Sequence, residues 1–434
     1  MLKNVDVLMP TKIGTNRRLL NRMEGLVSRI TADGFIMTFM PATGSSPARR
    51  LHIALIGTRG VPAAYGGFET AVEEVGRRMV SRGHRVSVYG RNESQIGSEY
   101  LGMRRVTLPA IHKKALETPS HTALSVLHAI ARRTPNVAIV FNAANSPFIP
   151  ALRLRGIPTA LHVDGLEWKR SKWGGAGRHY YRLAESFGVR TSDALIADSP
   201  GISDYYRHQF GATTELIAYG APHIEAMDSA RVAELALTPG DYHLVVARFE
   251  PENHVLEIVE GYHDSAASKP LVVVGSAPYS EEYTKKIQAI ADNDARIKLL
   301  GAIYDQEQLD SLYYHACSYI HGHSVGGTNP SLLRAIGAGR AVVAYDVSFN
   351  KHVLNGHGWF FSDSKDVAKC IQTVEESASK VADVGAQLQQ HARDNYTWDD
   401  VTDEYEALAL RLADGYSHRS SHRRARRKRV EWTG

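Results

Sequence analysis

The sequence predicts an α/β protein made of two doubly wound domains that face each other across a cleft. Short apolar runs alternate with stretches of helical periodicity from Leu51 onward, which is typical of parallel sheets covered by helices on both faces. The alternation stops around residues 220–241, where Thr238-Pro239-Gly240 indicates a turn, and then starts again. The chain of 434 residues is long enough for two large domains.

In the first half, short apolar runs bounded by turn residues are expected to be buried strands. The helix after the first run is expected because apolar residues recur at helical spacing from Ala71 to Val80. The expected strands are 51–56, 85–89, 137–141, 159–163, 194–197 and 215–218, and the expected helices are 68–81, 122–132, 180–190 and 203–210.

The second half repeats this pattern, with expected strands at 243–247, 271–274, 297–300, 318–320 and 341–344 and helices between them. The substrates of such sheets bind outside the carboxyl ends of the strands, so the loops there are expected to carry the chemistry.

The same patterns divide the chain into domains and ends. An N-terminal domain is expected over residues 51–225 and a C-terminal domain over residues 240–385. Residues 386–412 are expected to form helices that pack back on the first domain. Residues 1–50 have little periodicity and are expected to be a disordered extension, and residues 413–434 to be a basic disordered tail.

Composition excludes several classes of protein. Hydrophobic residues make up 43% of the chain and charged residues 22%, which is ordinary for a globular protein, and no run approaches the roughly 18 apolar residues that span a bilayer. Two cysteines exclude a disulfide scaffold and a four-cysteine zinc site, so a reducing cytoplasmic compartment is expected. The net charge of +5 comes from basic ends, +5 in residues 1–50 and +6 in residues 419–434, around a body of −6. This distribution does not indicate a nucleic-acid partner.

The loop after the first strand holds the first candidate site. Gly66 and Gly67 directly precede a helix, where exposed N–H groups and the helix dipole favour an anion, and Glu69 lies in the first turn. The spacing does not fit the G-x-G-x-x-G fingerprint of dinucleotide enzymes. Alternatively, the glycines only shape the turn and Glu69 only compensates the dipole.

The run from Ile53 to Tyr89, IALIGTRGVPAAYGGFETAVEEVGRRMVSRGHRVSVY, resembles the start of GT-B glycosyltransferases of family four. It is most similar to a bacterial subgroup that carries a domain of unknown function and is associated with rhamnosyltransferases. The resemblance implies a nucleotide-sugar on the second domain and an acceptor on the first, with Gly66, Gly67 and Glu69 on the acceptor side. It also implies a retaining, metal-independent hexosyltransferase that builds a cell-surface glycan or a lipid-linked saccharide.

A dense polar and aromatic cluster follows the strand expected at 159–163. Sugar hydroxyls need hydrogen-bond acceptors and sugar C–H faces pack on rings, so His162, Asp164, Glu167 and Trp168 are candidates. The string VDGLEWKRSKW resembles the subgroup's central motif, which implies that Asp164 and Glu167 lie near the reacting centre. The alternative is a capped turn with Trp168 in the core and a structural His162.

In the second half, a leaving diphosphate requires fixed cations or helix N-termini. Arg248 follows the strand expected at 243–247, and the family's pattern has Arg and, five residues later, Lys on the donor diphosphate; here the Lys position holds Asn253. Gly275 lies in a second loop at the same sheet edge. The alternative for Arg248 is a surface ion pair with Glu250 or Glu252.

The segment HGHSVGGTNPSLLRAIGAG resembles the family's donor loop. A helix is expected over 331–336 with a cap before it, so phosphate oxygens are expected on free N–H groups there. The resemblance makes Gly326, Gly327, Thr328, Asn329 and Ser331 donor-binding candidates.

The same segment departs from the family's pattern of two glutamates, because those positions hold Gly326 and Arg334. Arginine has no acceptor for ribose hydroxyls. The hypothesis is that Arg334 binds the diphosphate and so replaces the charge lost at Asn253.

No metal and no cofactor are expected besides the nucleotide-sugar co-substrate. Asp292-Asn293-Asp294 has the D-x-D spacing but lies at the amino end of a strand. The basic tail from Arg419 is expected to contact an anionic membrane at the inner face of the cell, or to be solvated without a partner. The rival functions are a non-catalytic GT-B protein that binds a glycan or partner enzyme, and a nucleotide-sugar epimerase.

Overall fold

A computed structural model describes residues 49–63, 66–91, 97–111, 116–132, 135–163, 165–170, 173–276 and 281–419. The described residues between Arg49 and Arg419 belong to one compact unit. Residues 1–48 of the extension predicted at 1–50, and residues 420–434 of the tail predicted at 413–434, lie outside the described residues.

The first sheet has eight strands in the order β3-β4-β2-β1-β5-β6-β7-β8, and all neighbours pair in parallel except β3 with β4. Its central strands are apolar and buried, as expected for a sheet covered on both faces. The strands are β1 (His52–Ile56), β2 (Arg85–Gly90), β3 (Glu99–Tyr100), β4 (Met103–Thr107), β5 (Val137–Phe141), β6 (Thr159–His162), β7 (Ala194–Ala197) and β8 (Glu215–Leu216).

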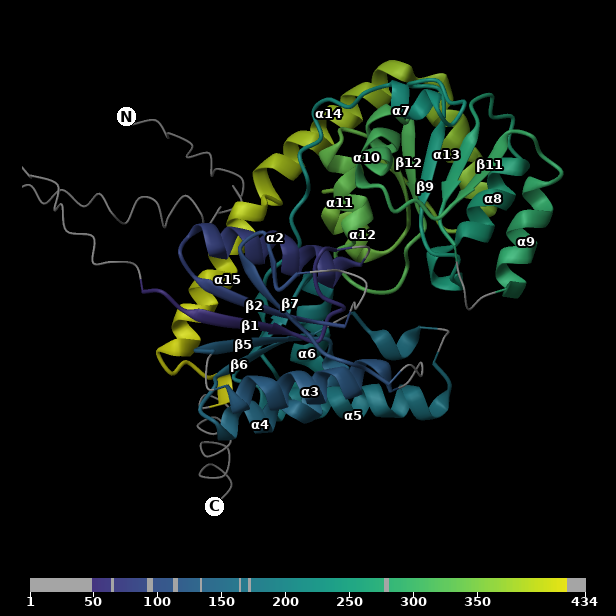
Figure 1. The fold of residues 1–434 in the computed structure, drawn as a ribbon. Coiled ribbons are helices and arrows are strands. Elements are labelled where there is room, and N and C mark those ends of the chain that lie inside the picture. The colour runs from purple at the N-terminus through teal and green to yellow at the C-terminus, as the bar shows by residue number, and fades with distance from the viewer. Residues whose placement is uncertain are drawn as a thin grey trace, which may run out of the picture. The chain divides into compact units, whose positions relative to one another are not determined.

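Two layers of helices cover this sheet, α2 and α15 on one face and α3, α4 and α5 on the other (Figure 1). Alternate residues of β1 serve both layers: Ile53 and Leu55 belong to the core under α2, while Ala54 and Ile56 belong to the core under α3 and α4. The helices are α2 (Gly67–Ser81), α3 (Glu117–Ala131), α4 (Ile149–Leu154), α5 (Gly175–Thr191) and α6 (Pro200–Phe210), with 3₁₀ turns η1 (Ala143–Phe148) and η2 (Glu167–Lys169).

The second sheet has six parallel strands in the order β11-β10-β9-β12-β13-β14. The strands are β9 (His243–Val246), β10 (Leu271–Val274), β11 (Ile297–Gly301), β12 (Ser318–His321), β13 (Ala341–Tyr345) and β14 (Trp359–Phe361). Its shorter helices are α7 (Ala230–Ala233), η3 (Pro251–Asn253), α8 (Val255–His263), α9 (Glu281–Ala291), α10 (Gln306–His315), α11 (Pro330–Gly337) and α12 (Ser348–Val353). Three long helices end the described chain: α13 (Ser364–Glu376), α14 (Ala378–Asn395) and α15 (Trp398–Ala413).

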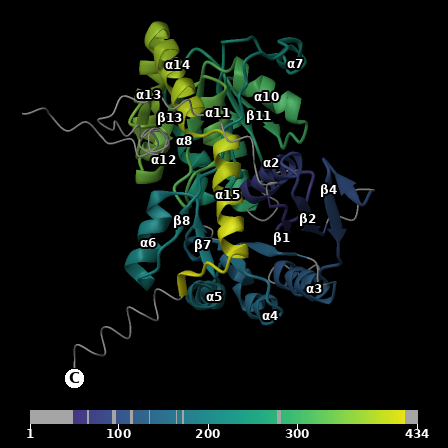
Figure 2. The ribbon, with the colours of Figure 1, turned by 90° about the vertical axis from the view of Figure 1, so that its left-hand side faces the viewer.

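The C-terminal helices cross to the first domain later than expected. Helix α14 packs on α11 and β13 of the second domain, and only α15 packs on α2 and β5 (Figure 2). The boundary predicted at 386 therefore falls inside a helix of the second domain. The crossing is fixed where Ala221 donates its N–H to the carbonyl of Tyr396 at 2.7 Å and Trp398 packs on Gly220.

The predicted start of the tail at 413 also needs correction. Ser417 donates its hydroxyl to Asp193 at 3.0 Å, and the buried His418 donates its backbone N–H to the carbonyl of Asp193 at 2.9 Å. Residues 414–419 are therefore anchored to the first domain, beside the end of α5.

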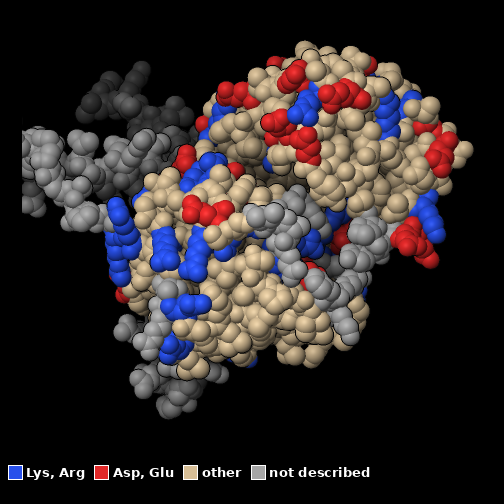
Figure 3. Space-filling model, in the orientation of Figure 1, with Lys and Arg blue, Asp and Glu red and all other residues tan. Residues whose placement is uncertain are grey.

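Charge divides between the two halves of the chain. Residues 49–222 carry 23 Lys and Arg against 13 Asp and Glu, whereas residues 223–418 carry 15 against 29. Figure 3 shows this division on one face, with most of the blue side chains over the first domain and more red over the second. The small net charge of the whole chain is therefore the sum of a basic first domain and an acidic second domain.

We predict that Trp398→Ala lowers the free energy of unfolding by about 3–5 kcal/mol, because it removes a large buried ring from the crossing point. Trp398 is 7% exposed, and a Cβ on Gly220 would lie 2.5–2.9 Å from its indole atoms. Urea denaturation measures the change. Tyr304→Ala, at a 71% exposed position, is the control and should change stability by less than about 0.5 kcal/mol; equal losses for both would contradict the packing role.

Candidate functional site

Glycine-rich segments of the two domains meet at the carboxyl ends of their parallel strands. Gly67 begins α2, and a Cβ on it would lie 3.2 Å from Pro330, the first residue of α11. Gly165 and Gly326 approach even more closely, because a Cβ on Gly165 would overlap the Cα of Gly326. The structure thus brings together the glycine turn and the donor loop that the sequence singled out.

The turn at Asp198 and Ser199, which the sequence analysis missed, holds the donor loop from the first domain. Thr328 donates its hydroxyl to the carbonyl of Asp198 at 2.8 Å. A Cβ on Gly327 would overlap the Asp198 carboxylate, so glycine is required there. The signal was available: Ser199 and Pro200 follow a strand and have the residue types favoured at the N-cap and first position of a helix.

The start of α11 is capped by its own side chains. Asn329 accepts the backbone N–H of Ser331 at 2.9 Å and the Ser331 hydroxyl at 2.8 Å, and Tyr319 donates its hydroxyl to Ser331 at 3.0 Å. The N–H of Ser331 is therefore occupied before any ligand arrives. In the described segment before α11, the N–H groups of Gly326, Gly327 and Thr328 have no acceptor, and neither does that of Asn329, so these amides could receive an anion.

Arg248 and Asn253 lie together at the carboxyl end of β9. The Arg248 side chain is 42% exposed, with Glu250 at 3.6 Å. Asn253 is buried: its amide donates to the carbonyl of Arg248 at 2.8 Å, and its amide oxygen is 2.7 Å from Nδ1 of His323. Asn253 therefore links Arg248 to the 321–331 segment. Its amide group would have to give up these contacts to bind the donor directly.

The imidazole of His323 lies within reach of cations from both domains. Its pKa is well below its ordinary value because it is buried, and His321, Arg170 and Arg248 lower it further. Arg170 belongs to the first domain and pairs with Glu167 at 2.7 Å, while Arg248 has the looser partner. A ligand phosphate that binds Arg248 therefore disrupts a weaker ion pair than one that binds Arg170.

The loop after β6 is held by internal pairs. Glu167 is buried, binds Arg170, and accepts the indole N–H of Trp173 at 3.3 Å. Trp168 lies against α5, with the Arg182 guanidinium 5.3 Å from its ring centre. These contacts give Glu167 and Trp168 positioning roles in the loop, and Asp164 lies outside the described residues.

His162 is a core residue rather than an exposed acid or base. Its ring stacks on Phe141 with centroids 5.4 Å apart and on Tyr219 at 6.1 Å, and Phe68 meets it edge-on at 5.0 Å. Burial lowers the pKa of His162 to about 4, so the ring is neutral at pH 7. The predicted contact between His162 and a donor-sugar hydroxyl is therefore corrected to the structural alternative.

Arg334 forms an ion pair with Asp310 of α10. Both side chains are about four-fifths buried, so the pair is part of the packing between α10 and α11. A role for Arg334 at the diphosphate would require this pair to break, which corrects the hypothesis that its charge stands in for the missing Lys.

On the acceptor side, Glu69 accepts the backbone N–H of Arg59 at 3.0 Å and so holds the loop after β1. Gly66 precedes the helix with φ 117°, a left-handed conformation that favours glycine. Gly275, likewise, packs so closely on the carbonyl of Ala247 that no side chain would fit.

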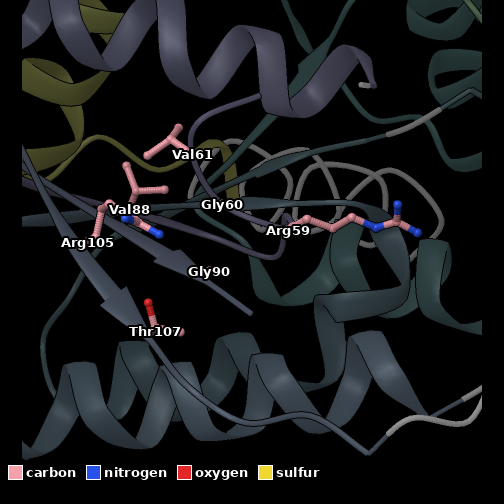
Figure 4. Close-up of a pocket in the computed structure, with 7 residues that line it drawn as sticks. All are labelled: Arg59, Gly60, Val61, Val88, Gly90, Arg105 and Thr107. Atoms are coloured by element: carbon pink, nitrogen blue, oxygen red, sulfur yellow. The ribbon is translucent and has the colours of Figure 1, made fainter. Parts of the chain in front are cut away.

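A small pocket lies beside the loop after β1, at the carboxyl ends of β2 and β4. Its empty volume, including open solvent, is about 190 Å³. In Figure 4 the Arg59 side chain points away from the other lining residues. The pocket is lined by Arg59, Gly60, Val61, Val88, Gly90, Arg105 and Thr107.

Two parallel-sheet domains whose glycine-rich loops meet at the carboxyl ends of their strands define the GT-B class. Residues 50–222 match the family described as a domain of unknown function (DUF1972), and residues 241–377 match the glycosyl transferases group 1. The chain therefore combines a DUF1972 domain with a glycosyl transferases group 1 domain on the GT-B fold.

Solved structures support the fold. Sucrose-phosphate synthase from Thermosynechococcus elongatus superposes with a TM-score of 0.72 at 18% identity, covering 84% of this chain and 99% of that one. HepE from Anabaena in complex with UDP-glucose gives 0.67 at 15% identity, covering 83% of this chain and 100% of that one.

Curated relatives include probable GTPases from Mycobacterium bovis and Mycobacterium tuberculosis, 31% identical over 149 residues. The match covers 32% of this chain and 41% of each relative, so the chain spans about two fifths of their length. A GTPase phosphate loop has the pattern G-x-x-x-x-G-K-[ST], and this sequence has no Gly-Lys pair. The likeness therefore transfers no GTPase activity.

No helix in the described ranges is long and apolar enough to cross a membrane. No three His, Cys, Asp or Glu side chains of this part of the chain are grouped as metal ligands.

We predict that His162→Phe makes stability less sensitive to acid. The ordinary His pKa of 6.5 applies to the unfolded chain and about 4 to the folded one. As pH falls from 6.5 to 4, the unfolded state alone takes up a proton, so the wild type loses up to about 3 kcal/mol that the variant keeps. Urea denaturation across this range measures the difference; parallel stability curves would contradict the buried, neutral assignment.

We predict that Arg334→Ala costs about 1–3 kcal/mol of stability, because Asp310 is left partly buried without its partner. A double-mutant cycle with Asp310→Ala should show coupling between the two sites. Isothermal titration with a nucleotide-sugar should show unchanged affinity for Arg334→Ala. Weaker binding would instead favour the hypothesis that Arg334 contacts the diphosphate.

Proposed function

We propose that the protein transfers a hexose from a nucleotide-sugar to a hydroxyl group of a bacterial cell-surface glycan or lipid-linked saccharide. The observation that carries this proposal is that Arg248 and the donor loop both lie near His323: Arg248 lowers the pKa of His323, and a Cβ on Gly326 would lie 3.0 Å from its Nε2. The N–H groups of residues 326–328 have no acceptor, and Gly326 also meets Gly165 of the DUF1972 domain. The group 1 family match supports a nucleotide-sugar donor. The UDP-glucose complex of HepE, on the same fold, is consistent with it.

In this proposal the bond between the anomeric carbon and the diphosphate oxygen breaks, and the acceptor oxygen bonds to that carbon. The acceptor hydroxyl gives up its proton, which leaves with the departing diphosphate. The departing diphosphate gains negative charge, so cations and N–H groups that are already in place stabilise it most in the transition state. Arg248 supplies the cation and the 326–328 backbone the N–H groups. Asn253 fixes Arg248 through its carbonyl, and Gly275 keeps the neighbouring loop close to β9.

The acceptor is proposed to bind on the first domain, over the loop that Glu69 holds and the turn at Gly66 and Gly67. Asp164 and Glu167 keep their proposed place near the reacting centre, Glu167 through the loop that it orders with Arg170. Rhamnose as the donor sugar, retention of configuration and independence of metal are proposed from the subgroup resemblance. A cytoplasmic location, with the basic tail at the inner face of the membrane, belongs to the same proposal.

A second candidate is a GT-B protein that binds a glycan or a partner enzyme without catalysis. Two observations favour it: Arg334 is committed to Asp310, and Asn253 is committed to Arg248 and His323. Neither Arg334 nor Asn253 is therefore free to replace the family's second Glu or Lys. Measurement of catalytic turnover distinguishes this candidate from the transferase.

We predict that Arg248→Ala lowers kcat for release of nucleoside diphosphate by roughly 10²–10³-fold, the usual cost of losing one donor to a developing anion. A panel of nucleotide-sugars, including those of rhamnose, is assayed by coupled detection of the diphosphate. Arg207→Ala removes an exposed guanidinium from α6 and serves as the matched control with unchanged kcat. Binding without any release in the wild type would establish the non-catalytic alternative.

Metal independence and retention of configuration are tested separately. Full activity in excess chelator supports metal independence. NMR of the product's anomeric proton shows whether the donor configuration is kept, and inversion would contradict the retaining assignment.

A further inference from the structure

The outer face of α3, α4 and α5 combines apolar and basic side chains. These helices lie side by side over one face of the first sheet (Figures 1 and 2), with α4 contacting both neighbours. We name this surface the α3–α5 face. Its exposed apolar residues, each more than a third exposed, are Leu124, Leu127, Leu154, Tyr180, Leu183 and Phe187.

The apolar residues form outward stripes because of helical spacing. On α5, Tyr180, Leu183 and Phe187 recur at intervals of three and four residues, while Tyr181, Ala184 and Gly188 are buried against the domain. Soluble surfaces carry scattered apolar residues, but a cluster over three adjacent helices indicates a contact with another surface.

Cations flank these stripes on the same helices. Arg178, Arg182 and Arg190 of α5 and Arg155 at the end of α4 are exposed, and no carboxylate of the described residues pairs with them. The acidic residues of the three helices are engaged elsewhere: Glu117 pairs with Arg91, and the buried Glu185 accepts the hydroxyl of Tyr205. The face is therefore apolar and positively charged.

The basic end of the chain starts at the edge of this face. Ser417 and His418 bind Asp193, which follows the C-terminal cap of α5 at Ser192 and also pairs with Arg153. Six further Lys and Arg follow within residues 420–429. Their point of attachment thus lies beside Arg153 and the end of α5.

We propose that the α3–α5 face binds an anionic lipid bilayer, with its leucines and Phe187 inserted at the headgroup boundary and its arginines on lipid phosphates. Amphipathic helices that lie in a membrane interface have this combination of an apolar stripe and flanking cations. The inference goes beyond the proposed transfer reaction and holds whether or not the protein is catalytic. It assigns membrane contact to the folded domain, in addition to the tail.

A second copy of the chain fits the face less well. In a two-fold symmetric contact the same surface meets itself, so the unpaired arginines of both copies would face each other. An anionic bilayer supplies the complementary charge that the described residues lack. A dimer is therefore an outcome that the experiment must be able to detect.

The test is flotation of the full chain with vesicles of phosphatidylcholine alone or mixed with phosphatidylglycerol. Arg178→Ala with Arg190→Ala should lower partition onto the anionic vesicles at least about tenfold, and Leu127→Ser with Leu183→Ser should lower it to a similar extent. The matched controls, Lys285→Ala with Lys286→Ala on α9 and Leu216→Ser with Tyr304→Ser, are exposed positions away from the face and should float like the wild type. A chain ending at residue 419 should keep part of its binding.

The proposal is overturned if the face variants float as well as the wild type, or if the chain ending at 419 loses all binding, which would assign it to the tail. A wild-type dimer in sedimentation that Leu127→Ser with Leu183→Ser dissociates would overturn it in favour of a second copy. Release of nucleoside diphosphate, measured in the absence of vesicles, should be the same in the face variants and the wild type. This separates failure of the membrane face from failure of the proposed transferase.

Discussion

The approach of Gly165 to Gly326 brings backbone from the two domains into direct contact, and the candidate site depends on it. Any side chain at Gly165 would overlap the donor loop. The same loop is fixed a residue later, where Gly327 and Thr328 rest on Asp198. Because these contacts use side-chain and carbonyl groups, the amide N–H groups of residues 326–328 remain available for an anion. Residues 326–328 thus provide both the close packing between the domains and the unbonded N–H donors.

Electrostatics at the site depends on which cations already have partners. Arg334 is paired with Asp310 and Arg170 with Glu167, so their charges stabilise helices and a loop. Arg248 has only a longer contact to Glu250 and is partly exposed. A ligand phosphate that binds Arg248 therefore breaks a weaker ion pair than it would by binding Arg170 or Arg334. The buried imidazoles nearby stay neutral, since the pKa of His321 is about 3 and that of His323 is also lowered.

Much of the fold follows from local sequence pattern. The apolar runs predicted at 137–141 and 271–274 are strands with those bounds, because a strand buried on both faces needs continuous apolar residues. Strand β4, which lies between the edge strand β3 and β2, was missed because Arg104 and Arg105 interrupt its apolar pattern. The return of the C-terminal helices to the first domain was predicted, and α15 makes it. The point of crossing was placed too early, at residue 386, because the buried face of α14 does not reveal which domain buries it. At the site, the glycine loops were found from their helix caps, whereas the pairing of Arg334 with Asp310 depends on how α10 packs on α11 and leaves no local signal.

The most direct test is a crystal structure of the protein with a nucleoside diphosphate. We expect the β-phosphate within hydrogen-bond distance of the Arg248 guanidinium and of at least one N–H among residues 326–328, with the pair between Arg334 and Asp310 intact. Phosphates bound elsewhere, or an Arg248 that keeps its partner Glu250 while Arg334 turns to the ligand, would contradict it.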